Sequence, residues 1–255
     1  MDRRQLAVAV IGAKGRMGST VCRAVGSAPD LRLVGSYDVG DDLGDLGGAD
    51  VVVEFSVPDA SLANVSACVS RGVHVVVGTT GWDDAKLAEL RAAVGAAPPA
   101  RSGAGVGVLI APNFALGAIL MMSFAQQAAR FFESVEVVEL HHPAKVDAPS
   151  GTAARTAALI GAARAEAGLG PIPDATTQDP DGARGARVSG IPVHALRVRG
   201  LVAHQEVIFG NVGETLTIRH DSLDRESFMA GVLTGVRRVG DHPGVTVGLE
   251  HYLGL

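Results

Sequence analysis

Short apolar runs that alternate with helical segments are the feature that most constrains the fold of this chain. Most of these runs end at a glycine or proline turn, and a segment with helical periodicity follows. Strands that are joined through helices by short connections pair in parallel. The first half of the chain therefore predicts an α/β fold with a doubly wound parallel sheet. Its expected strands are residues 6–11, 31–37, 50–55, 73–77 and 106–110.

The first expected strand leads into a glycine-rich turn. Residues 12–18 read GAKGRMG, a variant of the dinucleotide fingerprint in which glycines let the backbone approach a pyrophosphate at a helix start. Asp38 ends the next strand, twenty residues after Gly18, where a carboxylate would accept hydrogen bonds from the adenine-ribose hydroxyls. A carboxylate there should repel a 2′-phosphate and favour NADH, although Lys14 and Arg16 could soften that preference.

Two further turns, GTT at 78–80 and APNF at 111–114, follow the fourth and fifth strands. Ligands of doubly wound sheets bind at the carboxyl ends of the strands, so these turns should share one crevice with the glycine-rich turn. The alternative interpretation is that both turns are ordinary loops that bind no ligand. The residues expected around the crevice are Gly12, Ala13, Lys14, Gly15, Arg16, Met17, Asp38, Gly78, Thr79, Thr80, Ala111, Pro112, Asn113 and Phe114.

Residues 139–153, ELHHPAKVDAPSGTA, bring two adjacent histidines, a lysine and a Ser-Gly-Thr turn together within fifteen residues. The segment reads as a strand end, a loop and a helix start, where Ser150 or Thr152 can act as the N-cap. A helix N-terminus binds anions, and His141, His142 and Lys145 supply up to three donors nearby. The loop therefore predicts a site for a small carboxylate-bearing molecule beside a proton source. A solvated basic loop is the alternative.

The second half of the chain has a different organisation. A helix over 116–132, with Ile119, Leu120, Phe124 and Phe131 as candidate core positions, precedes a strand over 135–140 and a helix over 152–167. A long loop over 168–191 leads to strands over 193–199, 204–210 and 214–222. We expect a second, α+β domain with a mixed sheet whose open face meets another subunit. The predicted domains are 1–115 with 225–255, and 116–224.

Composition excludes several function classes. A formal net charge of −5 without a basic tract argues against a nucleic-acid binder. Cys22 and Cys68 fit neither a disulfide framework nor a zinc spacing, and we expect both to be buried free thiols. No His, Cys or Asp constellation has metal-ligand spacing. Residues 2–5 precede only a short apolar run, so we expect no membrane contact and a cytoplasmic location.

These motifs together resemble the 4-hydroxy-tetrahydrodipicolinate (dihydrodipicolinate) reductase family of the diaminopimelate route to lysine. The resemblance covers the whole chain, and the run HHPAKVDAPSGT is its most specific part. It implies an NAD(P)H-dependent oxidoreductase, of Rossmann type in its first domain and typically a homotetramer, that acts on a small cyclic dicarboxylate. It also implies that the crevice residues hold NADH or NADPH.

The resemblance further implies roles in the 139–153 segment. His141 matches the general acid, Lys145 a second proton donor, and His142, Gly151 and Thr152 the substrate contacts. Val39 stands where some members have an arginine that pairs with the 2′-phosphate, so a strict NADPH preference is not expected. Ala144 stands where relatives carry a basic residue, but the spacing of His141 to Lys145 is intact.

Several alternatives and expectations stay open on the sequence alone. The chain could be another NAD(P)H-dependent imine or amino-acid dehydrogenase, or a dinucleotide-binding redox sensor that has no turnover. Neighbouring residues on a strand face opposite sides unless the strand ends between them, so we predict that only one of His141 and His142 transfers a proton. Hinges near 114–117 and 222–225 are expected to close the domains on the substrate.

Overall fold

The computed structural model describes residues 4–255, so residues 1–3 of the N-terminal segment discussed above lie outside the described part. The chain divides into two compact units. Unit 1 comprises the described residues up to Ala115 together with Phe228–Leu255, and unit 2 comprises Leu116–Ser227. The chain thus leaves unit 1 once and returns to it. Four short 3-10 helices are present among the described residues: η1 (Leu46–Gly48), η2 (Arg225–Phe228), η3 (Val239–Asp241) and η4 (Leu249–Tyr252).

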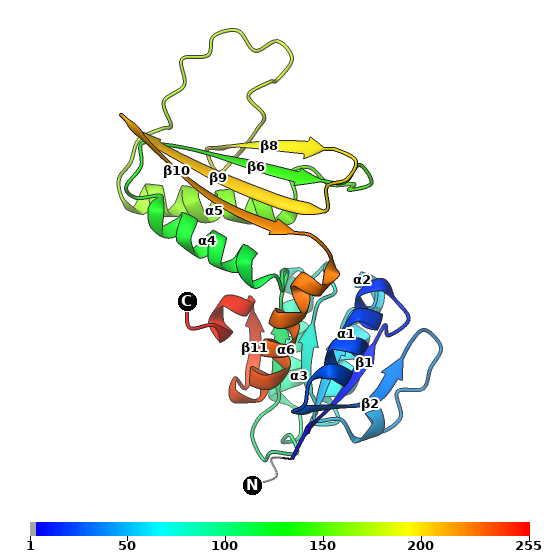
Figure 1. Cartoon of the computed structure of the whole chain (residues 1–255). Coiled ribbons are helices and arrows are strands. Elements are labelled where there is room, and N and C mark those ends of the chain that lie inside the picture. The colour runs from blue at the N-terminus through cyan, green and yellow to red at the C-terminus, as the bar shows by residue number, and fades with distance from the viewer. Residues whose placement is uncertain (1–3) are drawn as a thin grey trace. The chain divides into compact units, whose positions relative to one another are not determined.

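Unit 1 is built on a parallel sheet with the strand order β11-β5-β4-β3-β1-β2. Its strands are β1 (Leu6–Ile11), β2 (Leu31–Tyr37), β3 (Val51–Glu54), β4 (His74–Val77), β5 (Gly107–Ile110) and β11 (Gly244–Val247). Its helices are α1 (Arg16–Ser27), α2 (Pro58–Val69), α3 (Asp84–Gly95) and α6 (Met229–Arg238). Helices α1 and α6 contact each other and the sheet, and α2 and α3 form a second such pair (Figure 1). The predicted doubly wound fold is confirmed.

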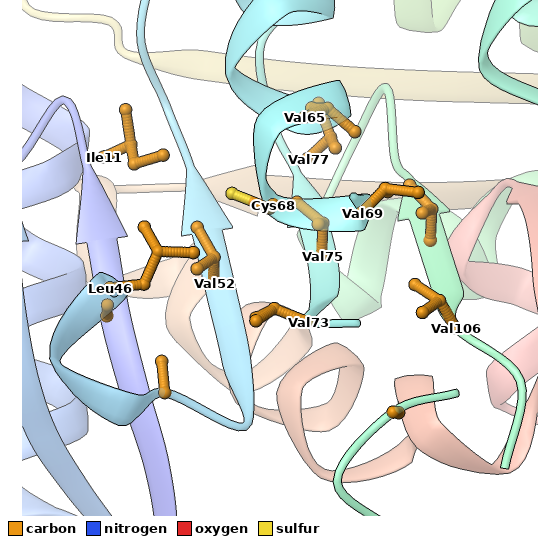
Figure 2. Close-up of a cluster of buried hydrophobic side chains, with 14 of the residues drawn as sticks. Ile11, Leu46, Val52, Val65, Cys68, Val69, Val73, Val75, Val77 and Val106 are labelled. Carbon is orange, nitrogen blue, oxygen red and sulfur yellow. The ribbon is translucent and has the colours of Figure 1, made fainter. Parts of the chain in front are cut away.

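The core of unit 1 follows from this layering. Strands β3 and β4 are buried along their whole length, as expected for strands with helices on both faces. Figure 2 shows Val52, Val65 and Val75 in one cluster with Cys68. Burial raises the pKa of the Cys68 thiol to about 12, so this cysteine is an inert part of the core. The prediction of two buried thiols is wrong for Cys22, which is partly exposed.

Unit 2 contains a mixed five-stranded sheet with the order β10-β9-β6-β8-β7. Strands β6 and β8 pair in parallel, whereas the other pairs are antiparallel. Helix α5 packs on β8 and β6, and α4 packs on α5 and β10 (Figure 1). The elements are α4 (Leu116–Ala128), β6 (Ser134–His141), α5 (Gly151–Glu166), β7 (Ala186–Val188), β8 (Ile191–Arg197), β9 (Ala203–Asn211) and β10 (Glu214–Ser222).

Two expectations for unit 2 are wrong. Phe124 and Phe131 were candidate core residues, but they are 49% and 71% exposed. Helix α4 carries apolar residues around its circumference, so its sequence does not tell that Phe124 faces outward. The helix ends at Ala128, before the predicted end at residue 132, so Phe131 lies outside it. The 168–191 loop also contains the short strand β7, which pairs with β8. Within residues 4–255, no helix is long and apolar enough to cross a membrane.

Candidate active site

The turn between β1 and α1 requires glycine at two positions. Gly12 adopts φ +80°, and a Cβ at this residue would lie 2.3 Å from the Phe55 carbonyl oxygen. A Cβ on Gly18 would lie 2.0 Å from the Gly12 carbonyl oxygen. The N-cap of α1, Gly15, provides no side-chain hydrogen bond to the helix start. The first N–H groups of α1 are therefore available to an anion, which is how helices of this kind bind a pyrophosphate.

Asp38 is held against this turn. Its carboxylate accepts hydrogen bonds from the backbone N–H groups of Lys14 at 2.8 Å and Val39 at 2.9 Å. These bonds, that of Val39 first, lower the pKa of Asp38, so the group is ionised at neutral pH. Gly12, Gly15 and Asp38 line one cavity of about 390 Å³ with Phe55, Ser56 and Asn64 among the other lining residues.

The turns after β4 and β5 both lie next to Phe55, which also lines the cavity that Gly12 and Asp38 line. The sequence did not indicate this role of Phe55. A Cβ on Gly78 would lie 2.0 Å from the Phe55 ring, and the Phe114 ring centroid lies 5.8 Å from that of Phe55. The hydroxyl of Thr79 is buried and has no hydrogen-bond partner among residues 4–255. Glycines that keep the turns open and an unsatisfied buried hydroxyl fit a site that receives a polar ligand such as a dinucleotide.

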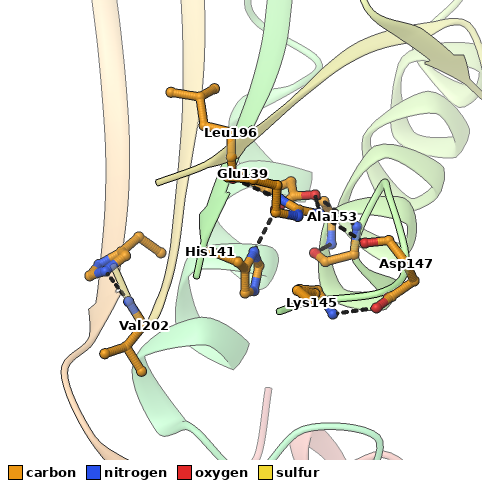
Figure 3. Close-up of polar contacts among 10 residues, drawn as sticks. Glu139, His141, Lys145, Asp147, Ala153, Leu196 and Val202 are labelled. Atoms are coloured by element: carbon orange, nitrogen blue, oxygen red, sulfur yellow. Dashed lines mark hydrogen bonds and ion pairs between the residues drawn. The ribbon is translucent and has the colours of Figure 1, made fainter. Parts of the chain in front are cut away.

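In unit 2, the end of β6 carries a buried ionic cluster. Glu139 and His141 are two residues apart on the strand, so both side chains project from the same face. The Glu139 carboxylate is 0% exposed and lies 2.5 Å from His141 Nδ1. Arg197, at the end of β8, donates two hydrogen bonds of 2.8 Å to the Glu139 carboxylate. Figure 3 shows His141 and Glu139 joined in this way.

The cluster sets the electrostatics of both groups. Burial acts to raise the pKa of Glu139, but hydrogen bonds from Arg197 and His141 outweigh it and lower the pKa. Burial also lowers the pKa of His141, and the Glu139 carboxylate opposes that shift. The charges of Lys145 and Arg197 lower the pKa of His141 further. The imidazole can therefore give up a proton readily once it carries one.

Helix α5 and the loop before it complete the cluster. The Ser150 hydroxyl caps α5 by accepting from Ala153 N at 3.2 Å, and Ser150 N donates to Glu139 at 3.1 Å. Lys145 Nζ donates to the Asp147 carboxylate at 2.7 Å. This bond lowers the pKa of Asp147, and the backbone N–H of Gly151 contributes to the same shift. Lys145 and the start of α5 thus already face a carboxylate, which shows what kind of group they can bind.

The two histidines differ in their setting. Strand β6 ends at His141, and His142 lies after it with an exposed side chain. The pleat therefore does not force the two rings to opposite faces, and their division of roles stays a prediction. Within residues 4–255, no three His, Cys, Asp or Glu side chains gather in a way that could hold a metal ion.

Family models match almost the whole chain. The model described as dihydrodipicolinate reductase, N-terminus, matches residues 6–114, and the model described as dihydrodipicolinate reductase, C-terminus, matches residues 117–253. The chain belongs to the dihydrodipicolinate reductase family.

Individual relatives agree with membership in the dihydrodipicolinate reductase family. The chain is 61% identical over 249 residues to 4-hydroxy-tetrahydrodipicolinate reductase of Thermobifida fusca, covering 97% of this chain and 99% of the relative. It is 60% identical over 248 residues to the enzyme of that name from Cutibacterium acnes, covering 97% and 98%. Among solved structures, dipicolinate-bound dihydrodipicolinate reductase from Paenisporosarcina sp. TG-14 matches with a TM-score of 0.83 and 33% identity, covering 97% of this chain and 99% of that one.

Proposed function

We propose that the chain reduces 4-hydroxy-tetrahydrodipicolinate to tetrahydrodipicolinate in lysine and diaminopimelate biosynthesis, with NADH or NADPH as the reductant. Family membership over both halves of the chain is the observation that carries this proposal. The reaction consumes a hydride and a proton and releases water. The dinucleotide would supply the hydride, so the protein has to supply the proton and hold two carboxylates.

We assign these tasks to residues of the described clusters. His141, partly buried beside Glu139, is the general acid, and Lys145 is the second proton donor. His142, Gly151 and Thr152 bind the substrate carboxylates, because a helix start attracts anions and an imidazole N–H can donate a hydrogen bond to a carboxylate. Unit 1 binds the dinucleotide, and unit 2 binds the substrate. The residues assigned to the dinucleotide are Gly12, Ala13, Lys14, Gly15, Arg16, Met17, Asp38, Gly78, Thr79, Thr80, Ala111, Pro112, Asn113 and Phe114.

A spectrophotometric assay tests the function. The purified protein is supplied with freshly generated 4-hydroxy-tetrahydrodipicolinate and with NADH or NADPH in separate reactions. We expect oxidation of the dinucleotide that depends on both the substrate and the protein. Binding of the dinucleotide without oxidation would favour a redox sensor, and oxidation only with a different imine would favour another dehydrogenase.

The ionised Asp38 leads to a prediction about the dinucleotide. Its carboxylate should repel the 2′-phosphate of NADPH, and Val39 offers no positive charge to balance it. We expect Asp38→Ser to improve kcat/KM for NADPH relative to NADH by about 10-fold. The ratio is measured with both dinucleotides at low salt, where surface charges are least screened. Asp42→Ser, which removes a neighbouring carboxylate that accepts from Gly44 N and not from the Asp38 backbone, serves as the comparison. An unchanged ratio in Asp38→Ser would remove Asp38 from the discrimination.

The assembly and location are also proposals. Leu196, Val198 and Ile208 in unit 2 are exposed apolar side chains, which favours contact with another copy and supports a homotetramer. Light scattering of the purified protein would give its mass in solution. We place the enzyme in the cytoplasm on the family resemblance, and fractionation of the producing cells would test that location.

A further inference from the structure

We propose that Glu139 is a positioning residue that, together with Arg197, fixes the orientation and tautomer of His141, so that Nδ1 carries a permanent proton and Nε2 exchanges its proton with the substrate. This inference rests on the proposed function, because it concerns how the assigned general acid is held. Neither residue was expected to have a role from the sequence.

The hydrogen bonds of the Glu139 carboxylate support this tautomer. One oxygen accepts from Arg197 at 2.8 Å and from Ser150 N at 3.1 Å. The other oxygen accepts from Arg197 at 2.8 Å and lies 2.5 Å from His141 Nδ1. An ionised carboxylate only accepts hydrogen bonds, so Nδ1 has to be the donor in this contact. In the neutral imidazole the other nitrogen, Nε2, is then the basic one.

Burial makes the arrangement rigid. Glu139 is 0% exposed, whereas its guanidinium partner is partly accessible. A buried carboxylate is stable only when it is paired and hydrogen-bonded, and four donors achieve that here. Rotation of the His141 ring away from Glu139 would remove one of these donors. The ring orientation is therefore tied to the stability of the strand end.

The same carboxylate also reaches the other assigned groups. Arg197 donates to the Asp147 carbonyl oxygen at 2.8 Å, and the Asp147 side chain is the partner of Lys145. Ser150 links Glu139 to the start of α5, where Gly151 lies. Through these hydrogen bonds, Glu139 and Arg197 connect β6, β8, the loop that precedes α5, and the start of α5 around His141.

A measurement on the unaltered protein tests the tautomer directly. The ¹⁵N chemical shifts of the His141 ring, assigned by comparison with His141→Gln, distinguish the two neutral tautomers. We expect the proton on Nδ1 in the neutral form. A neutral ring protonated at Nε2 would overturn the proposal, whether or not any Glu139 variant folds. This readout does not depend on turnover.

Two substitutions test the positioning role through the pH profile. The charged groups that act on His141 are Glu139, which raises its pKa, and Lys145 and Arg197, which lower it. Glu139→Gln should move the alkaline limb of kcat to lower pH by about one unit, whereas Arg197→Gln should move it to higher pH. Glu139→Gln should also lower kcat by about 10- to 100-fold, as for other carboxylates that orient a histidine.

Glu136→Gln is the matched control. Glu136 lies on the same strand and also pairs with a histidine, His194, at 2.7 Å and with an arginine, Arg184. It belongs to none of the assigned groups, so its pH profile should equal that of the unaltered protein. Far-UV circular dichroism and thermal unfolding show whether each variant is folded, because the substituted residues lie in unit 2 and NADH binding reports on unit 1.

The outcomes separate this inference from the proposed function. If the unaltered protein does not oxidise NADH or NADPH with the substrate, the proposed function fails. If it does, and Glu139→Gln and Arg197→Gln shift the limb in the same direction or not at all, the positioning role fails while the function stands. General structural damage would not produce shifts of opposite sign.

Discussion

Replacing His141 with glutamine is expected to lower kcat by about 10²- to 10⁴-fold, the range that a positioned general acid contributes. The glutamine amide can still donate a hydrogen bond to the Glu139 carboxylate, but it cannot transfer a proton at neutral pH. Steady-state kinetics with the freshly generated substrate measure the loss. NADH binding should be unchanged, because the assigned dinucleotide residues lie in unit 1.

His142→Gln is the comparison for this prediction. His142 is exposed and is assigned to a substrate carboxylate, so its loss should raise KM more than it lowers kcat. Burial lowers the pKa of His141, so kcat of the unaltered enzyme should fall as the pH rises through that lowered value. Identical losses in the two variants, confined to kcat, would contradict the division of roles.

The second large effect is expected from Gly78→Ala. The backbone of Gly78 is not in the left-handed region, so the cost of the methyl group is steric. The new Cβ would lie 2.0 Å and 2.2 Å from two atoms of the Phe55 ring. The ring packs against Phe114 and lines the cavity beside Gly12, so displacing it alters the cavity wall.

We expect Gly78→Ala to lower the free energy of unfolding by about 1–3 kcal/mol, as overpacking does in other proteins. Dinucleotide binding should weaken by about 10- to 100-fold if most of this free-energy cost adds to the free energy of the complex with the dinucleotide. Calorimetry and a fluorescence titration measure the two quantities. Gly26→Ala is the matched control, because a Cβ there meets no atom within 4 Å and should leave binding unchanged. Unchanged binding in Gly78→Ala would exclude this turn from the dinucleotide site.

The sequence predicted the fold of unit 1 well for a physical reason. Strands such as β3 and β4 are buried on both faces, so they appear as continuous apolar runs. Glycine turns and helical periodicity then mark each connection. The sequence was less informative about which apolar side chains pack in the core. Helix α4 offers apolar residues in several directions, and only packing selects Ile119 and leaves Phe124 exposed.

The candidate site was predictable only where its residues are neighbours in sequence. His141, Lys145 and Ser150 fall within one loop, and that loop also carries the family resemblance. Glu139 looked like an ordinary strand residue, although its position two residues before His141 places both on one face. Its partner Arg197 comes from another strand, 58 residues away, and no local pattern links the two. The role of Phe55 likewise depends on contacts between different strand ends.

The return of the chain to unit 1 has a consequence for folding of the protein during its synthesis on the ribosome. Strand β11 pairs with β5 at one side of the sheet, yet it is made only after all of unit 2. Until the last residues leave the ribosome, the nascent polypeptide presents β5 as an unpaired edge, which is a template for wrong association. A premature stop before residue 244 should therefore yield an aggregating product even though most of both units has already been translated.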